Sequence, residues 1–209
     1  MLKEKIVLGL SGTSRSGKDT FASILETKLV KAGKSVLRVA LAEPLKNQCA
    51  PFLKEKFGLD AHAQDTETKT FMRPFFVWYG DAQRKRTNGR YWINLATSVI
   101  DSTNRDYYII TDVRYDHYEK DELYWLKTEM RGSLCHISRF AYNEQGMKVY
   151  NPPANEHEAT NDPKLKISAD YMVEWENIPN LSSDELILND SMNDHVESYM
   201  KALNIPAKE

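Results

Sequence analysis

Several features that mark particular classes of protein are scarce in this chain of 209 residues. Only two cysteines are present, Cys49 and Cys135, and their separation fits neither a metal site nor a disulfide framework. No apolar run is long enough to cross a bilayer, and the N-terminal residues lead into a strand rather than a signal peptide. We therefore expect two reduced, mostly buried thiols in a cytoplasmic protein that does not contact membranes.

An excess of charge of one sign is also missing. The 28 Lys and Arg residues nearly balance the 30 Asp and Glu residues, which gives a formal net charge of -2. A general nucleic-acid binder would usually be strongly basic, so we expect no nucleic-acid partner. The hydrophobic content of 41% is ordinary for a globular protein, and the length suits one domain over residues 1–209.

Two glycines bracket a short loop near the start of the chain. Gly12 and Gly17 follow an apolar run at residues 6–10 and precede a helix-like pattern. A strand, a glycine-bounded loop and a helix are the context that a phosphate-binding P-loop requires. Inward-facing backbone N–H groups and the helix N-terminus would bind a polyphosphate, while Lys18 reaches its outer phosphates.

The residue after this lysine departs from the common form of the motif. Asp19 follows Lys18, and the hydroxyl comes one place later, at Thr20. A carboxylate beside a polyphosphate is unfavourable unless a cation lies between them, so Asp19 is a candidate metal ligand. The residues expected to bind the polyphosphate are Gly12, Ser14, Arg15, Ser16, Gly17, Lys18, Asp19 and Thr20.

Short apolar runs alternate with helical patterns along the chain. This alternation predicts an α/β fold of three layers around a mostly parallel five-stranded sheet. The strands are expected at residues 6–10, 35–41, 106–111, 133–138 and 170–175. Helices are expected after the P-loop, after residue 43 with a kink or break at Pro51, and at about 71–82, 92–102, 118–126 and 192–203.

Four segments fall at the carboxyl ends of the predicted strands, where α/β sheets bind ligands. They are the P-loop, residues 43–46, residues 112–114 and Arg139. Phosphoryl transfer needs positioning and neutralisation of charge more than covalent chemistry, and cations supply the neutralisation. We therefore expect one cleft for this reaction, with Lys46, Arg73, Arg84, Arg86 and Arg114 among its cations.

Several of these candidates have a second interpretation. The arginines between residues 73 and 90 would also suit a solvated helix face. Trp78 and Trp92 could stack on a base or serve as core aromatics. Asp112 ends an apolar strand, where it could hold Mg²⁺ or one of its waters, cap a helix, or pair with Arg114.

One long segment lacks any periodic pattern. Residues 140–163 are polar and contain Gly146, Pro152 and Pro153. Loops of this length in a compact domain are usually functional or disordered. We interpret residues 139–163 as a lid.

Motifs through most of the chain resemble those of the bacteriophage deoxynucleoside monophosphate kinases, a branch of the P-loop nucleoside monophosphate kinases. The matching stretches are SGTSRSGKDTFA at 11–22, ALAEPLK at 40–46, RPFFVWYGDAQR at 73–84, ITDVR at 110–114, ISR at 137–139 and NEHEAT at 155–160. The stretch at 76–80 and the His157–Thr160 pattern depart from the family. Because both touch substrate contacts, base specificity does not follow from the resemblance.

The resemblance implies a P-loop kinase fold with an NMP-binding helical region at residues 43–105. It implies transfer of the ATP γ-phosphate to a deoxynucleoside monophosphate with Mg²⁺, for DNA synthesis, in a host cytoplasm if the gene is a phage's. The implied catalytic residues are Lys18, Asp19, Arg114 and Arg139. The implied substrate-binding residues are Lys46, Arg73, Trp78, Arg84 or Arg86, Trp92, Asp112 and Arg114, with Asp19 and Asp112 at the metal.

Two alternatives stay open at this point. A phosphomevalonate kinase of the animal type shares the Gly-Lys-Asp, Pro-Leu-Lys and Asp-x-Arg features. A nucleotide-dependent binding module would need only the P-loop, although the arginines beyond it argue against that reading. The sequence also leaves a homodimer open.

Overall fold

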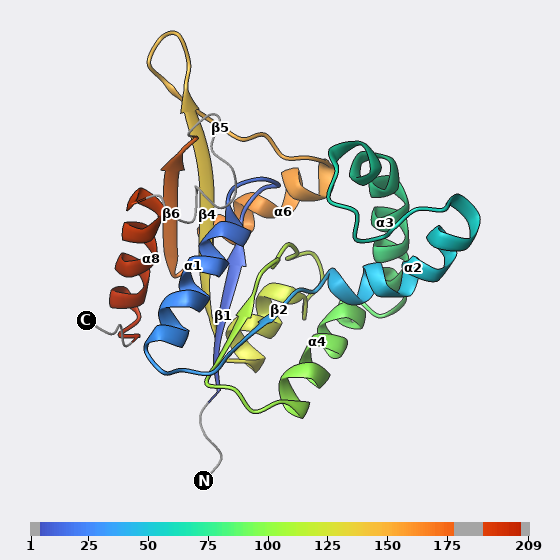
Figure 1. Cartoon of the computed structure of the whole chain (residues 1–209), viewed down its shortest axis with the longest axis horizontal. Helices are drawn as coiled ribbons and strands as arrows, with labels where there is room; N and C mark the ends of the chain where they lie inside the picture. Colours follow the sequence, from blue (N-terminus) through green and yellow to red (C-terminus); the bar gives the residue numbers. More distant parts are fainter. Residues whose placement is uncertain (1–4, 178–189, 206–209) are drawn as a thin grey trace.

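The computed structural model describes residues 5–177 and 190–205, which form an α/β fold around a mostly parallel sheet (Figure 1). Parallel pairing joins β2 (Val36–Val39) to β3 (Tyr107–Ile110), and β3 to β1 (Ile6–Ser11). Parallel pairing continues from β1 to β4 (Ser133–Tyr142) and from β4 to β6 (Tyr171–Glu176). The predicted fold class is confirmed, and the five predicted strands are the five parallel ones.

The remaining elements surround this sheet and carry the residues of the later argument. They are α1 (Lys18–Lys31), α2 (Glu43–Phe57), α3 (Thr66–Arg86), α4 (Arg90–Ser102), α5 (Glu122–Tyr124), the π-helical turn η1 (Trp125–Glu129), β5 (Lys148–Tyr150), α6 (Glu156–Ile167) and α8 (Asp190–Ala202).

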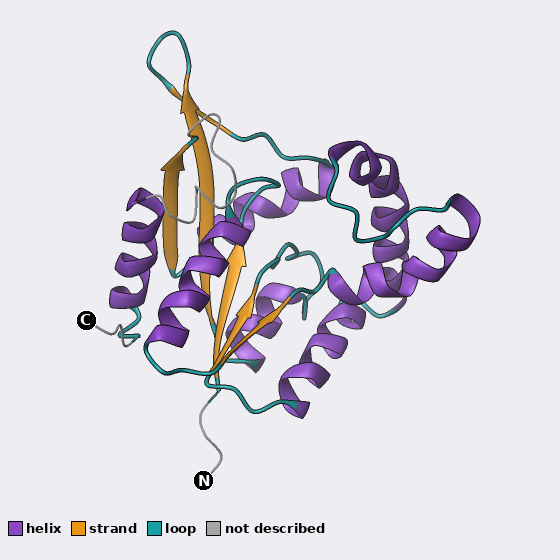
Figure 2. Cartoon of the chain, viewed as in Figure 1, coloured by secondary structure: helices purple, strands orange, loops and turns teal. Residues whose placement is uncertain are grey.

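Helices cover both faces of the sheet (Figure 2). Alternate residues of β3 show this, because Ile109 packs with α1 and α8 while Ile110 packs with α4 and η1. Successive side chains of a strand point to opposite faces, so an uninterrupted apolar strand needs a hydrophobic layer on each side. The apolar runs of the sequence therefore correctly indicated a sheet with a layer of helices on each face.

Helices α2 and α3 form an arm beside the sheet (Figure 1). The arm has its own small hydrophobic cluster, built on the buried Cys49, Leu53, Ala61 and Met72. The helical region predicted at 43–105 is present, but α4 packs on the sheet rather than in the arm. Helix α2 runs through Pro51 to Phe57, so the predicted break there is wrong.

The segment interpreted as a lid is more regular than expected. Strand β4 continues to Tyr142 and turns through a hairpin into the antiparallel β5, and α6 begins at Glu156. The predicted irregular loop is therefore wrong as secondary structure. The hairpin side chains are mostly exposed, which explains why the segment lacks the apolar periodicity of a packed element.

Other expectations concern single elements and residues. The helix predicted at 118–126 is the short α5 followed by η1. Both cysteines are free and buried, as expected. None of the helices in the described part of the chain is both long and apolar enough to cross a membrane. Residues 1–4, on which the signal-peptide expectation partly depends, lie outside the described residues.

Candidate functional site

The P-loop lies between β1 and α1, as the sequence predicts. Gly12 and Gly17 adopt positive φ angles of 134° and 95°, which side chains rarely tolerate. A Cβ on Gly12 would collide with the Ile137 carbonyl, and one on Gly17 would collide with the Trp175 ring. Glycine is therefore required at both positions by backbone angle and by space.

Lys18 begins α1 and folds back over the loop. Its Nζ donates hydrogen bonds to the carbonyl oxygens of Gly12 at 2.8 Å and Thr13 at 2.6 Å. Burial, helped by the positive charge of Arg114, lowers the pKa of Lys18 to about 8. The two carbonyls thus hold Lys18 in the loop. Burial destabilises its charged form, and a bound anion would stabilise that form.

The other charged P-loop residues face solvent. The Asp19 side chain is 93% exposed and lies 3.7 Å from Arg38 in an ion pair. Arg15 is exposed, and its carbonyl accepts a hydrogen bond from Asn151. The metal role of Asp19 stays a prediction, since a solvent-facing carboxylate can bind Mg²⁺ through a water.

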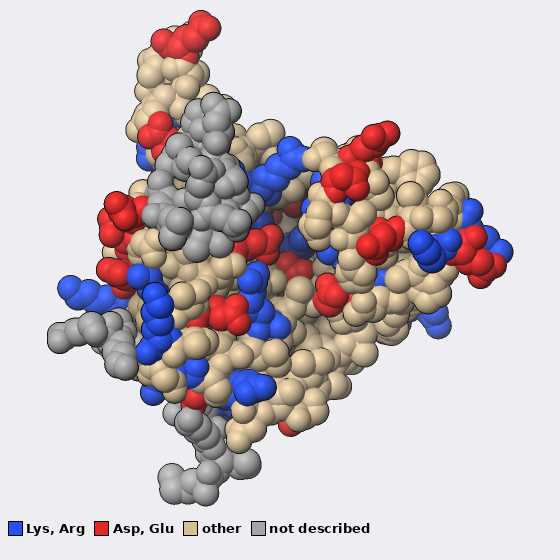
Figure 3. Space-filling view, in the orientation of Figure 1, with Lys and Arg blue, Asp and Glu red and all other residues tan. Residues whose placement is uncertain are grey.

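A cavity of about 320 Å³ lies between the sheet ends and the arm. Figure 3 shows Lys and Arg side chains in the hollow between the arm and the body of the molecule. The cavity brings together the predicted residues Ser14, Lys46, Arg73, Arg84, Trp92, Asp112 and Arg114. Their convergence from five separate segments agrees with the strand-end argument.

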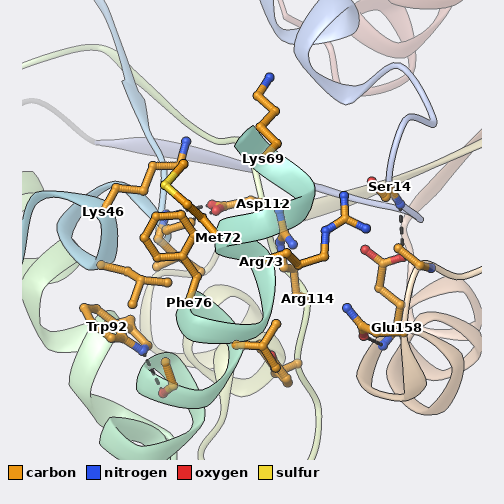
Figure 4. Close-up of a pocket in the computed structure, with 18 of the residues that line it drawn as sticks. Ser14, Lys46, Lys69, Met72, Arg73, Phe76, Trp92, Asp112, Arg114 and Glu158 are labelled. Carbon is orange, nitrogen blue, oxygen red and sulfur yellow. Dashed lines mark hydrogen bonds between the residues drawn. The ribbon is translucent and has the colours of Figure 1, made fainter. Parts of the chain in front are cut away.

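The cavity is divided along its length (Figure 4). Phe76 and Trp92 lie toward one side, Arg73 and Arg114 lie in the middle, and Ser14 of the P-loop lies on the other side. Apolar side chains that also line the cavity are Leu41, Leu45, Met72 and Val77. An elongated ligand with an apolar head and an anionic group facing the P-loop would match this order.

Arg84 is held by carboxylates, which counts against its predicted role as a phosphate ligand. It is 3% exposed, and its guanidinium donates to Asp121 at 2.7 Å and to Glu122 at 3.2 Å. Burial disfavours its charged form, but these carboxylates outweigh that and raise the pKa of Arg84. Its guanidinium also lies 3.6 Å from the Tyr115 ring centre, so it supports one wall of the cavity.

Two further residues of α3 that were predicted to bind substrate lie outside this cavity. Trp78 is 66% exposed and stacks on Phe75 outside the cavity. Arg86 is exposed and does not line the cavity either. Trp92, by contrast, is buried at the cavity wall and donates from Nε1 to the Gly80 carbonyl at 3.2 Å.

Asp112 organises the sheet end beneath the cavity. Its Oδ1 accepts from the backbone N–H of Leu41 at 2.7 Å, and its Oδ2 accepts from Ala42 at 3.0 Å. Burial disfavours a charged Arg114, but the carboxylates of Asp112 and Glu158 outweigh it and raise the pKa of Arg114. The Asp112 carboxylate therefore holds the backbone before α2 and balances the charge of Arg114. Its predicted role at the metal remains a prediction.

Arg139 lies on β4 rather than in a mobile loop, and it does not line the cavity. Its guanidinium sits 4.6 Å from the Trp175 ring centre, and Trp175 Nε1 donates to the Ser16 carbonyl at 2.7 Å. Burial lowers the pKa of Arg139. Arg139 thus lies behind the P-loop, and its predicted catalytic role remains a prediction.

Sequence reasoning missed some cavity residues, chiefly Lys69, Phe76 and Glu158. Glu158, on α6, accepts a hydrogen bond from the backbone N–H of Ser14 at 3.1 Å. The motif at 155–160 includes Glu158, but it did not indicate that this carboxylate reaches the P-loop, because the segment was interpreted as an irregular lid. Lys69 and Phe76 share one face of α3 with Arg73, a periodic signal that was available.

The side chains of the described residues do not form a preassembled metal site. Within residues 5–177 and 190–205, no group of three or more His, Cys, Asp or Glu side chains could hold a metal ion. Mg²⁺ in phosphoryl-transfer sites is usually bound by one or two carboxylates plus substrate phosphates, so a preformed cluster is not required.

Comparisons with known proteins place these features in context. A family model described as phosphomevalonate kinase matches residues 10–131. Among curated proteins, no sequence matches. Solved structures that match include an APS kinase mutant from Mycobacterium tuberculosis, with 13% identity, a TM-score of 0.42 and coverage of 97% of this chain and 99% of that one. A shikimate kinase from Acinetobacter baumannii in complex with shikimate has 14% identity, a TM-score of 0.46 and coverage of 97% and 95%.

Proposed function

The chain belongs to the phosphomevalonate kinase family of P-loop kinases, and we propose that this member phosphorylates a deoxynucleoside 5′-monophosphate. The γ-phosphate of ATP would pass to the acceptor phosphate and give the diphosphate, for DNA synthesis in the cytoplasm. The observation that carries this proposal is the division of the cavity into an aromatic end and a cationic middle beside the P-loop.

The two parts of the cavity suit the two parts of a nucleotide. A base has a planar aromatic face, and Phe76 and Trp92 offer aromatic contacts for that face. Its 5′-phosphate would then reach Arg73 and Arg114, since a guanidinium can grip phosphate oxygens in two places. Lys46 and Lys69 add positive charge along the same cavity.

The residues present fit the phosphates of ATP on the other side. The Ser14 N–H already donates a hydrogen bond to a carboxylate oxygen, which supports binding of a phosphate oxygen at that position. Lys18 would turn from the Gly12 and Thr13 carbonyls toward the β- and γ-phosphates. Bound Mg²⁺ would neutralise phosphate charge, with Asp19 or Asp112 as the carboxylates that could hold it or its waters.

Phosphomevalonate is the second candidate, because the matched family carries that description. Phosphomevalonate has an aliphatic chain with a carboxylate at the end opposite its phosphate. That carboxylate would need a cation at the far end of the cavity. Figure 4 places Phe76 and Trp92 on that side together with Lys46, which is a cation that could meet the carboxylate, and the cavity-lining Arg84 is neutralised by Asp121 and Glu122. The two aromatic rings beside Lys46 favour a base over an aliphatic chain.

An acceptor screen tests the proposal. Purified protein with ATP and Mg²⁺ is assayed for ADP formation with dAMP, dGMP, dCMP, dTMP, modified dCMP and phosphomevalonate. We expect turnover with one or more deoxynucleotides, and loss of well over a hundredfold in Lys18→Ala, since removing charge that stabilises the transition state costs about 3 kcal/mol or more. Turnover of phosphomevalonate with all nucleotides inert would establish the second candidate instead.

A further inference from the structure

Glu158 links the nucleotide loop to the acceptor cavity. It lies in the first turn of α6 and lines the cavity. Its Oε2 accepts hydrogen bonds from the backbone N–H of Ser14 at 3.1 Å and of Ala154 at 2.8 Å. Figure 4 shows the contact with Ser14 at the edge of the cavity nearest the P-loop.

The surroundings of this carboxylate are those of an anion site. Ser14 is inside the glycine-bounded loop whose N–H groups are suited to phosphate oxygens. The negative charge of Glu158 also acts on Lys18 and Arg114, favouring the protonated form of each. A backbone N–H, a lysine and an arginine around one carboxylate are the partners that a phosphate group would use.

We propose that Glu158 occupies the phosphate position at Ser14 in the nucleotide-free protein, and that nucleotide phosphates displace it and thereby couple the two sites. The acceptor named in the coupling rests on the proposed function, but the displacement does not. A phosphate and a carboxylate cannot share one N–H donor without strong repulsion at this distance. Nucleotide binding therefore requires Glu158 to leave the edge of the acceptor cavity.

The rest of α6 is anchored, so the side chain must move more than the helix. Asp162 Oδ1 lies 3.1 Å from Nε2 of the buried His136. Asn161 Oδ1 accepts a hydrogen bond from the Asp116 N–H at 3.0 Å. The Asn155 side chain caps the helix by accepting from the Glu158 N–H at 2.9 Å. These contacts keep α6 in place while the carboxylate of Glu158 swings away from Ser14.

Coupling of this kind is reciprocal. A ligand that removes Glu158 from the cavity edge makes the acceptor site easier to fill, and an acceptor phosphate repels Glu158 from the same place. ADP should therefore strengthen acceptor binding, and acceptor should strengthen ADP binding by the same factor. The arrangement would favour loading of both sites before transfer begins.

The test compares two neutralising substitutions on the same helical turn. Glu158→Gln removes the charge but keeps a side chain that can serve in the capping box. Glu156→Gln removes an equal charge from an exposed position two residues away. ADP binding is measured by calorimetry without acceptor, and we expect Glu158→Gln to bind ADP about tenfold more tightly while Glu156→Gln matches the wild type.

A second variant and a second readout separate coupling from folding. Glu158→Asp keeps the charge but shortens the side chain, so it should lose the Ser14 contact and also bind ADP more tightly. Acceptor affinity is then measured with and without ADP, and the ADP effect should shrink in Glu158→Gln. Thermal unfolding of each variant checks that the fold is retained.

The outcomes distinguish this inference from the proposed function. Equal or weaker ADP binding in both Glu158 variants would overturn the displacement, even if the wild type phosphorylates deoxynucleotides. Tighter ADP binding in those variants would support it, even if every deoxynucleotide proved inert as an acceptor. An unchanged ADP effect on acceptor affinity in Glu158→Gln would overturn the coupling.

Discussion

Arg84 and Arg86 are two residues apart in α3. The Arg84 guanidinium pairs with buried carboxylates, whereas Arg86 is exposed to solvent. Removing Arg84 leaves the buried carboxylates of Asp121 and Glu122 without their cation. Breaking a buried ion pair from one side typically costs about 3–5 kcal/mol. We expect Arg84→Met to lower the free energy of unfolding by that amount, measured by urea denaturation.

The exposed Arg86 supplies the matched control. Arg86→Met should change the free energy of unfolding by no more than about 0.5 kcal/mol, as is usual for surface substitutions. Similar losses in the two variants would contradict the assignment of Arg84 to the wall of the cavity. A stable Arg84→Met protein with weakened acceptor binding would instead restore Arg84 as a phosphate ligand.

Lys18 should make nucleotide binding dependent on pH. Its pKa in the free protein is about 8, lowered first by burial. Nucleotide phosphates favour the charged lysine and raise that pKa, so binding above pH 8 must take up a proton. We expect ADP affinity, measured by calorimetry without Mg²⁺, to fall up to about tenfold per pH unit between pH 8 and the pKa of the complex.

Lys18→Arg isolates this effect, because arginine stays protonated throughout the range. In that variant the decline in ADP affinity above pH 8 should disappear, whatever its absolute affinity. The same decline in both proteins would assign the pH dependence to another group.

At the scale of elements, α3 places its functional residues on one face. With about 100° per residue, Lys69, Phe76, Gly80 and Arg84 all fall within about 60° of Arg73 around the helix. Trp78 falls about 140° away, and so does Arg86 in the other sense. Helical periodicity therefore indicates that Trp78 and Arg86 do not share the face of Arg73, although the motif includes Trp78 and is followed closely by Arg86.

This geometry yields a prediction for the acceptor. Phe76→Ala should raise the acceptor KM at least about fivefold, since base–aromatic stacking contributes about 1–3 kcal/mol per base. Trp78→Ala removes a larger ring from the opposite face and should leave that KM unchanged. Steady-state kinetics with the best deoxynucleotide provide the measurement, and the reverse order of effects would mean that the base lies elsewhere.

The segment after β4 shows where sequence patterns lose their power. Its hairpin buries little, so no alternation of apolar residues predicted β5. The start of α6 did carry a local signal, because Asn155 and Glu158 have the spacing of a helix cap. That signal indicates where the helix begins, but not that the same Glu158 reaches the P-loop.

For the whole molecule, the sheet was predictable and the partners within the site were not. Apolar strands alternating with helices determine a parallel sheet, and strand ends then converge without further information. Which carboxylate meets which cation depends on contacts between residues far apart in the chain, such as Ser14 with Glu158 or Arg84 with Asp121. Charge type alone could not tell Arg84, which is neutralised, from Arg73, which remains at the cavity.

The continuity of P-loop, cationic middle and aromatic end leads to a last prediction for the whole molecule. A bisubstrate compound that joins adenosine to a deoxynucleoside through a chain of phosphates should occupy both sites at once. Linking two ligands makes the second binding event intramolecular, so its affinity should exceed that of either nucleotide alone. At 100 times its Kd it should stabilise the fold by about 2.7 kcal/mol, read as a rise in Tm. In Arg73→Ala the compound should no longer bind more tightly than ATP, whereas Arg86→Ala, which lies outside the cavity, should keep the difference. Equal affinities of the compound and ATP for the wild type would mean that the two sites are not in line.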